Sequence, residues 1–246
     1  MVNFDKLFSY LEHYCSTLLT AEEKEWLYQN GKVLTYKKGE FISINRFPYA
    51  YFICQGLLAK QFWCMDGEKR RILLFGQPND LLFTVANVYS STLLEYDVYA
   101  LRNSVVIRFQ IQKLREFKDR TALGNTWIHI AQNRNLRQLR QRSHLTLIPN
   151  EVKRYVCFYK RMRQLYHLTT YTEQADYLNI SRTSIWRALR GGINVFSLMT
   201  MEIIFLKLAL ALPNSIFDKQ SITFLLLSPA HDRWIKVYFR SIAAGA

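Results

Sequence analysis

The stretch Thr172–Leu189 constrains this chain more than any other, because it reads as two short helices joined by a tight turn. Asn179 stands at the turn, where a left-handed backbone is usually needed and Asn is the next choice after Gly. Ser181 is placed to cap the second helix. Apolar residues recur at spacings that let both helices bury one shared seam: Ala175, Leu178, Ile180, Ile185 and Leu189. The pattern predicts a helix-turn-helix, whose second helix enters the DNA major groove, with an ordinary helical hairpin as the alternative.

Positive charge is concentrated around this motif. Residues 1–110 carry a net charge of only +1, whereas residues 111–150 carry +6 and residues 151–195 carry +5 of the total +14. Between Lys113 and Arg142, only Glu116 and Asp119 interleave acids with the bases. Such a segment attracts phosphate and supplies the salt-dependent part of DNA binding. A solvated, charged helix face is the alternative interpretation.

Length and composition bound the class of protein. A chain of 246 residues, 50% of them hydrophobic, suits one large or two small domains with well-buried cores. The most apolar stretch, Ile193–Leu212, is interrupted by Asn194, Glu202 and Lys207, and no signal peptide is visible. The cysteines show neither a CxxC pair nor zinc-ligand spacing: Cys15, Cys54, Cys64 and Cys157. We therefore expect a cytoplasmic protein with free thiols, no membrane span and no metal site.

The first 110 residues predict helices followed by an antiparallel roll. Phe4–Cys15 and Ala21–Asn30 read as amphipathic helices, the second opened by a capping box at Thr20 and Glu23. Short aromatic and aliphatic runs, separated by turn signals such as Asp66-Gly67, predict strands at 32–36, 41–44, 51–54, 57–64, 70–75, 94–101 and 104–109. Seven or eight such strands indicate a small barrel or jelly roll, so the fold class is α+β with a sensor domain at 1–110.

Residues 111–146 predict one long helix. The segment contains no Pro and one Gly, and its apolar residues recur at intervals of about three and four: Leu114, Phe117, Leu123, Trp127, Ile128, Ile130, Ala131, Leu136 and Leu139. Such a stripe is typical of a helix that lies along a partner, so we expect a dimerisation helix and a homodimer. Packing on its own barrel alone is the alternative.

The rest of the chain is divided into a DNA-binding domain and a tail. We expect residues 147–212 to form a winged helix-turn-helix domain that opens with an amphipathic helix over Glu151–Tyr166, with Arg154 facing outward. Gly191-Gly192 ends the recognition helix, and Ile193–Phe196 and Met201–Phe205 could form the strands of the wing. Residues 213–246 are an extension to which the sequence assigns no role.

This order of elements resembles the CRP/FNR family of bacterial transcription regulators over about residues 1–205. The most specific part is Thr172–Leu189, which is similar to the family pattern Q-E-x-A-x-x-L-G-x-S-R-x-[ST]-x-x-R. Weaker support comes from Tyr36–Ile42 and Tyr51–Leu58, which resemble the family's early β-roll strands. The resemblance implies a cyclic-nucleotide-binding-like β-roll, a long dimerisation helix and a C-terminal winged helix-turn-helix.

The resemblance also implies which residues touch DNA. Arg182, Thr183 and Arg187 occupy the positions from which family members contact base edges, and an Arg bound to guanine O6 and N7 is the commonest specific contact. Trp186 is a further candidate, packing on sugar, on a thymine methyl or only on Tyr177. Phosphate contacts, which position the domain without reading sequence, are expected from four polar residues: Thr172, Gln174, Ser181 and Ser184.

The expected roll lacks the family's cyclic-nucleotide signature. Gly76–Tyr96 supplies Asn79, Asp80, Asn87 and Glu95 but no Arg or Lys. A cyclic phosphate would have no positive partner in that stretch, so we expect no binding of cAMP or cGMP and predict no cofactor. The effector stays unknown.

The leading hypothesis is a dimeric, sequence-specific regulator and not an enzyme. It would bind a pseudo-palindromic operator in double-stranded DNA, with half-sites about one helical turn apart, and would work with RNA polymerase. Two alternatives stay open. One is a recombinase or transposase that uses the helix-turn-helix to find its site, and the other is a regulator that needs no small molecule.

Overall fold

The chain begins with two helices. In this computed structural model, which describes residues 2–42, 48–63, 70–85, 88–90 and 96–191, α1 (Val2–Cys15) is followed by α2 (Ala21–Asn30). The predicted capping box is confirmed, because Glu23 N donates to Thr20 Oγ1 at 3.2 Å and Thr20 N donates to Glu23 Oε2 at 3.0 Å. The predicted wing strands and residues 213–246 lie outside the described residues.

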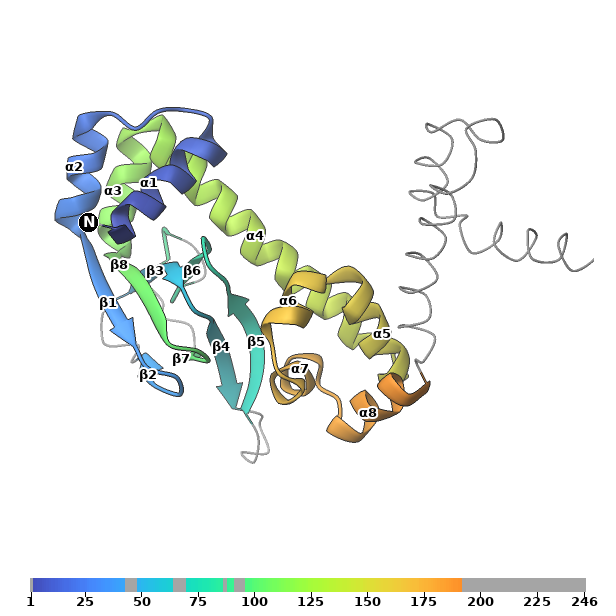
Figure 1. The fold of residues 1–246 in the computed structure, drawn as a ribbon. Coiled ribbons are helices and arrows are strands. Elements are labelled where there is room, and N and C mark those ends of the chain that lie inside the picture. Colours follow the sequence, from blue (N-terminus) through green and yellow to red (C-terminus); the bar gives the residue numbers. More distant parts are fainter. Residues whose placement is uncertain (1, 43–47, 64–69, 86–87, 91–95, 192–246) are drawn as a thin grey trace, which may run out of the picture. The chain divides into compact units, whose positions relative to one another are not determined.

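The strands of the described residues form two antiparallel four-stranded sheets (Figure 1). One sheet has the order β1-β8-β3-β6 and the other β2-β7-β4-β5. Their bounds are β1 (Gly31–Tyr36), β2 (Phe41–Ile42), β3 (Tyr49–Gln55), β4 (Leu58–Trp63), β5 (Arg70–Gly76), β6 (Leu81–Phe83), β7 (Asp97–Ala100) and β8 (Ser104–Gln110). The expected β-roll is confirmed. The short β6 was not predicted, because three residues are too few to show a period.

Strand β3 shows how the two cores are built. Alternate side chains of a strand point to opposite faces. Ala50 and Phe52 pack in the cluster formed with the helices, whereas Tyr51 and Ile53 pack between the two sheets. Both faces are therefore buried, which explains why this stretch is continuously apolar in the sequence.

The predicted single helix over 111–146 is wrong, because two helices occupy this stretch: α3 (Ile111–Arg120) and α4 (Ala122–Thr146). Thr121 separates them in an extended conformation, with its side chain accepting from Gly124 N at 2.9 Å and donating to Phe117 O at 3.0 Å. A Cβ at Gly124 would lie 2.6 Å from the Phe117 ring. The two helices therefore cross closely at this glycine.

The apolar stripe of α4 covers the chain's own roll. Leu123, Trp127, Ile128 and Ala131 are buried in the cluster with α1 and β3, which is the alternative left open by the sequence. Leu136 is 48% exposed. The exposed side of α4 follows alternating intervals of three and four residues and is mostly polar: Thr126, His129, Asn133, Leu136 and Arg140.

Four short helices follow the long one: α5 (Glu151–Arg161), α6 (Arg163–Leu168), α7 (Tyr171–Leu178) and α8 (Arg182–Gly191). The predicted helix over 151–166 is interrupted at Met162, whose backbone leaves the helical region. The expectation that Arg154 faces outward is wrong, since its side chain is buried among backbone carbonyls described below.

Two further observations concern the cysteines and the helices of the described residues. Cys15, Cys54 and Cys157 are free, while Cys64 lies outside the described residues. None of the helices in the described part of the chain has the length and apolar character needed to span a membrane.

Candidate nucleic-acid interface

The two short helices and the tight turn predicted over Thr172–Leu189 are present as α7 and α8. Thr170 and Glu173 form a capping box at the start of α7, with Thr170 N donating to Glu173 Oε2 at 2.7 Å. Asn179 ends α7 in the left-handed region, at φ 53° and ψ 54°, as expected. Four of the predicted seam residues are buried: Ala175, Leu178, Ile180 and Ile185. The turn therefore has the backbone and the packing that the sequence indicated.

Helix α8 presents one exposed polar face. Ser181 caps the helix by accepting from Ser184 N at 3.1 Å. Arg182, Thr183, Trp186 and Arg187 are all exposed, whereas Ile185 and Ala188 are buried. Residues four apart lie on the same side of a helix, so these four side chains share one face. The structure thus brings together all the residues predicted to contact bases.

Trp186 has a different neighbour from the one considered in the sequence. Its side chain is 51% exposed and meets Tyr171 edge-on, with ring centroids 5.5 Å apart. Tyr177, the predicted partner, is fully buried. Tyr171 is the first residue of α7, so the aromatic pair bridges the two helices at their exposed side.

Two of the predicted phosphate contacts are corrected by the structure. Gln174 is 1% exposed, and its amide accepts from Tyr155 Oη at 2.9 Å and donates to the carbonyls of Tyr166 and Thr169. Ser184 is 6% exposed, and its hydroxyl lies 2.9 Å from Ser181 Oγ. The Gln174 amide and the Ser184 hydroxyl therefore have their hydrogen-bond partners within the protein. Thr172 and Ser181 are exposed.

Glu151, which the sequence reasoning missed, sits at the N-terminus of α8. Its Oε2 accepts from Ser181 N at 3.2 Å and from Ser181 Oγ at 3.3 Å. Hydrogen bonds from the Ser184 hydroxyl, then from Ser181, lower the pKa of Glu151 below its usual value. A carboxylate is stabilised at the positive end of a helix dipole, but it also places negative charge where a DNA phosphate would approach.

For the DNA-binding role predicted from the sequence, Glu151→Gln is expected to tighten binding by about three- to tenfold, because removing one like charge beside a phosphate is worth about 1 kcal/mol. A fluorescence-anisotropy titration with duplex DNA measures the change. The gain should shrink as salt is added, since salt screens the repulsion. Unchanged or weaker binding at low salt would mean that Glu151 lies away from the DNA.

Arg154 fixes the turn of the motif from α5. Its guanidinium makes four hydrogen bonds to three carbonyls: two to Ile148 O (3.0 and 2.7 Å), one to Leu178 O (2.9 Å) and one to Asn179 O (3.0 Å). The last carbonyls of a helix have no partner within the helix, so a donor must come from elsewhere. Arg154 supplies it, at 8% exposure.

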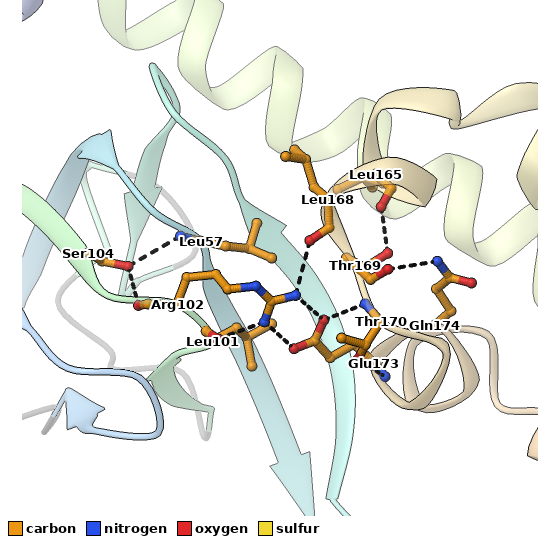
Figure 2. Close-up of polar contacts among 10 residues, drawn as sticks. All are labelled: Leu57, Leu101, Arg102, Ser104, Leu165, Leu168, Thr169, Thr170, Glu173 and Gln174. Atoms are coloured by element: carbon orange, nitrogen blue, oxygen red, sulfur yellow. Dashed lines mark hydrogen bonds and ion pairs between the residues drawn. The ribbon is translucent and has the colours of Figure 1, made fainter.

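The roll also holds the first helix of the motif (Figure 2). Arg102, in the turn between β7 and β8, donates to Glu173 Oε1 at 2.6 Å, to Glu173 Oε2 at 2.9 Å and to Leu168 O at 3.1 Å. Burial raises the pKa of Glu173, but the hydrogen bonds from Arg102 and Thr170 outweigh it and lower the pKa overall. One carboxylate thus caps α7 and ties it to the roll.

Further contacts join α7 to β5 and α4. The rings of Phe75 and Tyr177 lie 4.9 Å apart, and Arg71 pairs with Asp176 at 3.7 Å. Arg142 of α4 donates from Nε to Tyr177 O at 2.9 Å. The placement of α7 on the roll is therefore set by side chains from three separate elements. The sequence could not reveal these pairs, because their partners are far apart along the chain.

The comparisons with known proteins agree on the fold. No protein-family description and no curated protein sequence matches the chain. Among solved structures, FixK2 from Bradyrhizobium japonicum is 17% identical over 65% of this chain and 83% of its own, with a TM-score of 0.55. A protein described as a transcriptional regulator of the CRP/FNR family from Eubacterium rectale is 14% identical over 74% and 86%, with a TM-score of 0.55. The c-di-GMP-responsive global regulator CLP from Xanthomonas campestris is 12% identical over 70% and 91%, with a TM-score of 0.52.

Proposed function

Because the described residues share the fold of CRP/FNR regulators, we propose that this chain is a sequence-specific, DNA-binding transcription regulator of that type. The observation that carries the proposal is the exposed face of α8, where Arg182, Thr183, Trp186 and Arg187 stand together after a capped turn. The basic charge of residues 111–195 supports it, since charge of this sign attracts the DNA backbone. Residues 1–110 would be the sensor domain and residues 147–212 the DNA-binding domain.

In the proposed complex, α8 lies in the major groove. Arg182 and Arg187 read guanine edges with paired hydrogen bonds, and Thr183 contacts a neighbouring base. Trp186, supported by Tyr171, packs on a sugar or a thymine methyl. Thr172 and Ser181 face the backbone, although Glu151 already accepts from both donors of Ser181.

We propose that two copies bind together, pairing through the exposed side of α4. Its residues at alternating intervals of three and four have the spacing of a helix–helix contact, with Leu136 as the apolar centre. A two-fold dimer places its two recognition helices about one turn of DNA apart.

A signal received by the roll would reach α7 through Arg102 and β5, shifting the population of DNA-binding arrangements. We also propose that the DNA-bound regulator contacts RNA polymerase.

Selection of bound sequences from a random duplex pool tests this function. We expect one enriched motif made of two inverted half-sites, whose centres are about 10 base pairs apart. A single half-site would contradict the dimer, and the absence of any enriched sequence would contradict sequence-specific binding.

Arg187→Ala is expected to weaken binding to the selected site by about 1–3 kcal/mol and to relax the preference at one base pair. The loss arises because the variant no longer pairs with the guanine edge. Competition titrations with the selected site and its single-base variants measure both effects. Lys32→Ala, an exposed charge change in β1 outside the basic segment 111–195, serves as the control and should leave binding unchanged. Equal loss on every sequence would show that Arg187 contacts only phosphate.

A further inference from the structure

Two adjoining hollows lie where α4 meets the end of α5 and the start of α6. The first has a volume of about 400 Å³ and extends from α4 to the turn between β5 and β6. The second, of about 550 Å³, opens beside it along the outer side of α4. Arg137, Gln141 and Arg161 line both. The hollows therefore meet at two arginines that come from different helices.

The lining of these hollows is strongly basic. Five arginines line them, together with His144: Arg134, Arg137, Arg140, Arg161 and Arg163. Asp80 is the one acidic residue in the lining, and it pairs with Arg134 at 3.6 Å. Within the described ranges, no ion pair engages Arg137, Arg140 or Arg161. Three guanidinium groups are thus left without a neutralising partner there.

The guanidinium groups of Arg137, Arg140 and Arg161 are exposed and repel one another weakly, so an anion between them is favoured. Arg137 and Arg140 are three residues apart on one helix face, where like charges repel, and Arg161 adds a third charge from α5. Guanidinium groups match phosphate with paired hydrogen bonds, and the neighbouring Gln141 amide offers a further donor. In addition, the buried Oε1 of Gln77, which lines the first hollow, has no hydrogen-bond partner among the described residues. A nucleoside triphosphate would satisfy all of these groups, because it carries both phosphates and hydrogen-bond donors. A free oligophosphate would satisfy the arginines and the Gln141 amide, but not the Gln77 oxygen.

We propose that the joined hollows bind a ligand with several linked phosphate groups, either a free oligophosphate or a nucleoside triphosphate. Arg137 and Arg161 hold one phosphate between α4 and α5, and Arg140 holds the next. The bound ligand ties α4 to the helix that carries Arg154, and Arg154 in turn fixes the turn of the helix-turn-helix. This site is separate from the exposed face of α8, and it does not depend on DNA binding. The second hollow adjoins the α4 surface proposed for pairing, because Asn133, Leu136 and Arg140 belong to both, so we expect ligand binding and pairing of two copies to affect each other.

Calorimetric titration of the full chain, at constant ionic strength, tests the proposal with tripolyphosphate and with ATP. One site per chain is expected, and Arg137→Gln and Arg161→Gln should each weaken it by about tenfold, as befits a lost charge-assisted hydrogen bond. Arg120→Gln, an exposed arginine at the end of α3, is the matched control and should change affinity less than about twofold. If ATP binds more tightly than tripolyphosphate, the ligand of the site is a nucleotide. If tripolyphosphate binds more tightly, the ligand is a free oligophosphate.

Three results would overturn the proposal. One is no saturable binding by the wild-type chain, and another is an equal loss in the Arg120 variant. The third is weaker binding of the phosphate ligand by Arg187→Gln together with unchanged binding by Arg137→Gln, because the phosphates would then occupy the α8 face proposed for DNA. Thermal unfolding of each variant shows that it is folded, and Arg140→Gln replaces any variant that is not. No DNA enters this assay, so its result and that of the sequence selection are independent.

Discussion

Arg154→Ala is expected to lower the free energy of unfolding of the helix-turn-helix by about 3–5 kcal/mol, the range for breaking a buried charged network. The substitution leaves the carbonyls of Ile148, Leu178 and Asn179 without their donor in a buried place. Urea unfolding followed by circular dichroism measures the loss. DNA affinity should fall with it, because the turn that sets the angle of α8 loses its support.

Lys153→Ala is the matched control for this change. Lys153 precedes Arg154 in α5, and its side chain is exposed. Its removal should change stability by less than about 0.5 kcal/mol, as is usual for surface positions. Equal urea midpoints for the two variants would contradict the role given to Arg154.

Lys60→Met is expected to raise the free energy of unfolding by about 3 kcal/mol at pH 7. Lys60 is 6% exposed within β4, and burial lowers its pKa to about 8 from an ordinary 10.5. Among the described residues it has no ion-pair partner. The folded state therefore holds a charge that it disfavours, and methionine keeps the apolar stem without that charge.

The pH dependence of this gain has a definite sign. Below about pH 8 the folded and unfolded states both carry the proton, so the full penalty of the buried charge applies. Between pH 8 and 10.5 the folded state loses the proton first, and the difference between Lys60→Met and wild type should shrink to zero. Chemical denaturation at several pH values measures it, with the exposed Lys32→Met as control. A pH-independent difference, or a loss of stability at pH 7, would contradict this account.

The two helices α7 and α8 and the turn between them were predictable from local sequence signals. Asn179 predicts the turn and Ser181 predicts the helix cap from only a few neighbouring residues, and the structure confirms both. The exposed face of α8 follows directly from the helical period, so Arg182, Trp186 and Arg187 lie where the sequence placed them. Neither result depends on contacts with distant parts of the chain.

Other features depended on distant partners and could not be predicted. Gln174 looks like an exposed residue of the first turn, but its side-chain amide accepts from Tyr155 Oη and donates to the carbonyls of Tyr166 and Thr169. Arg154 lies among basic residues in the sequence, yet its side chain is buried and donates a hydrogen bond to Leu178 O at the end of α7. The apolar stripe of α4 identified a buried face without saying that its own roll covers that face.

Missing-base interference on the selected duplex tests most directly whether α8 reads DNA. Each guanine of the site is removed in turn, and binding of the wild-type chain is compared with binding of Arg187→Ala. Removal of one guanine in each half-site should weaken binding by the wild type but leave binding by the variant unaffected, because the variant has already lost the contact. Identical patterns for both proteins, or a pattern in which no base matters, would contradict it.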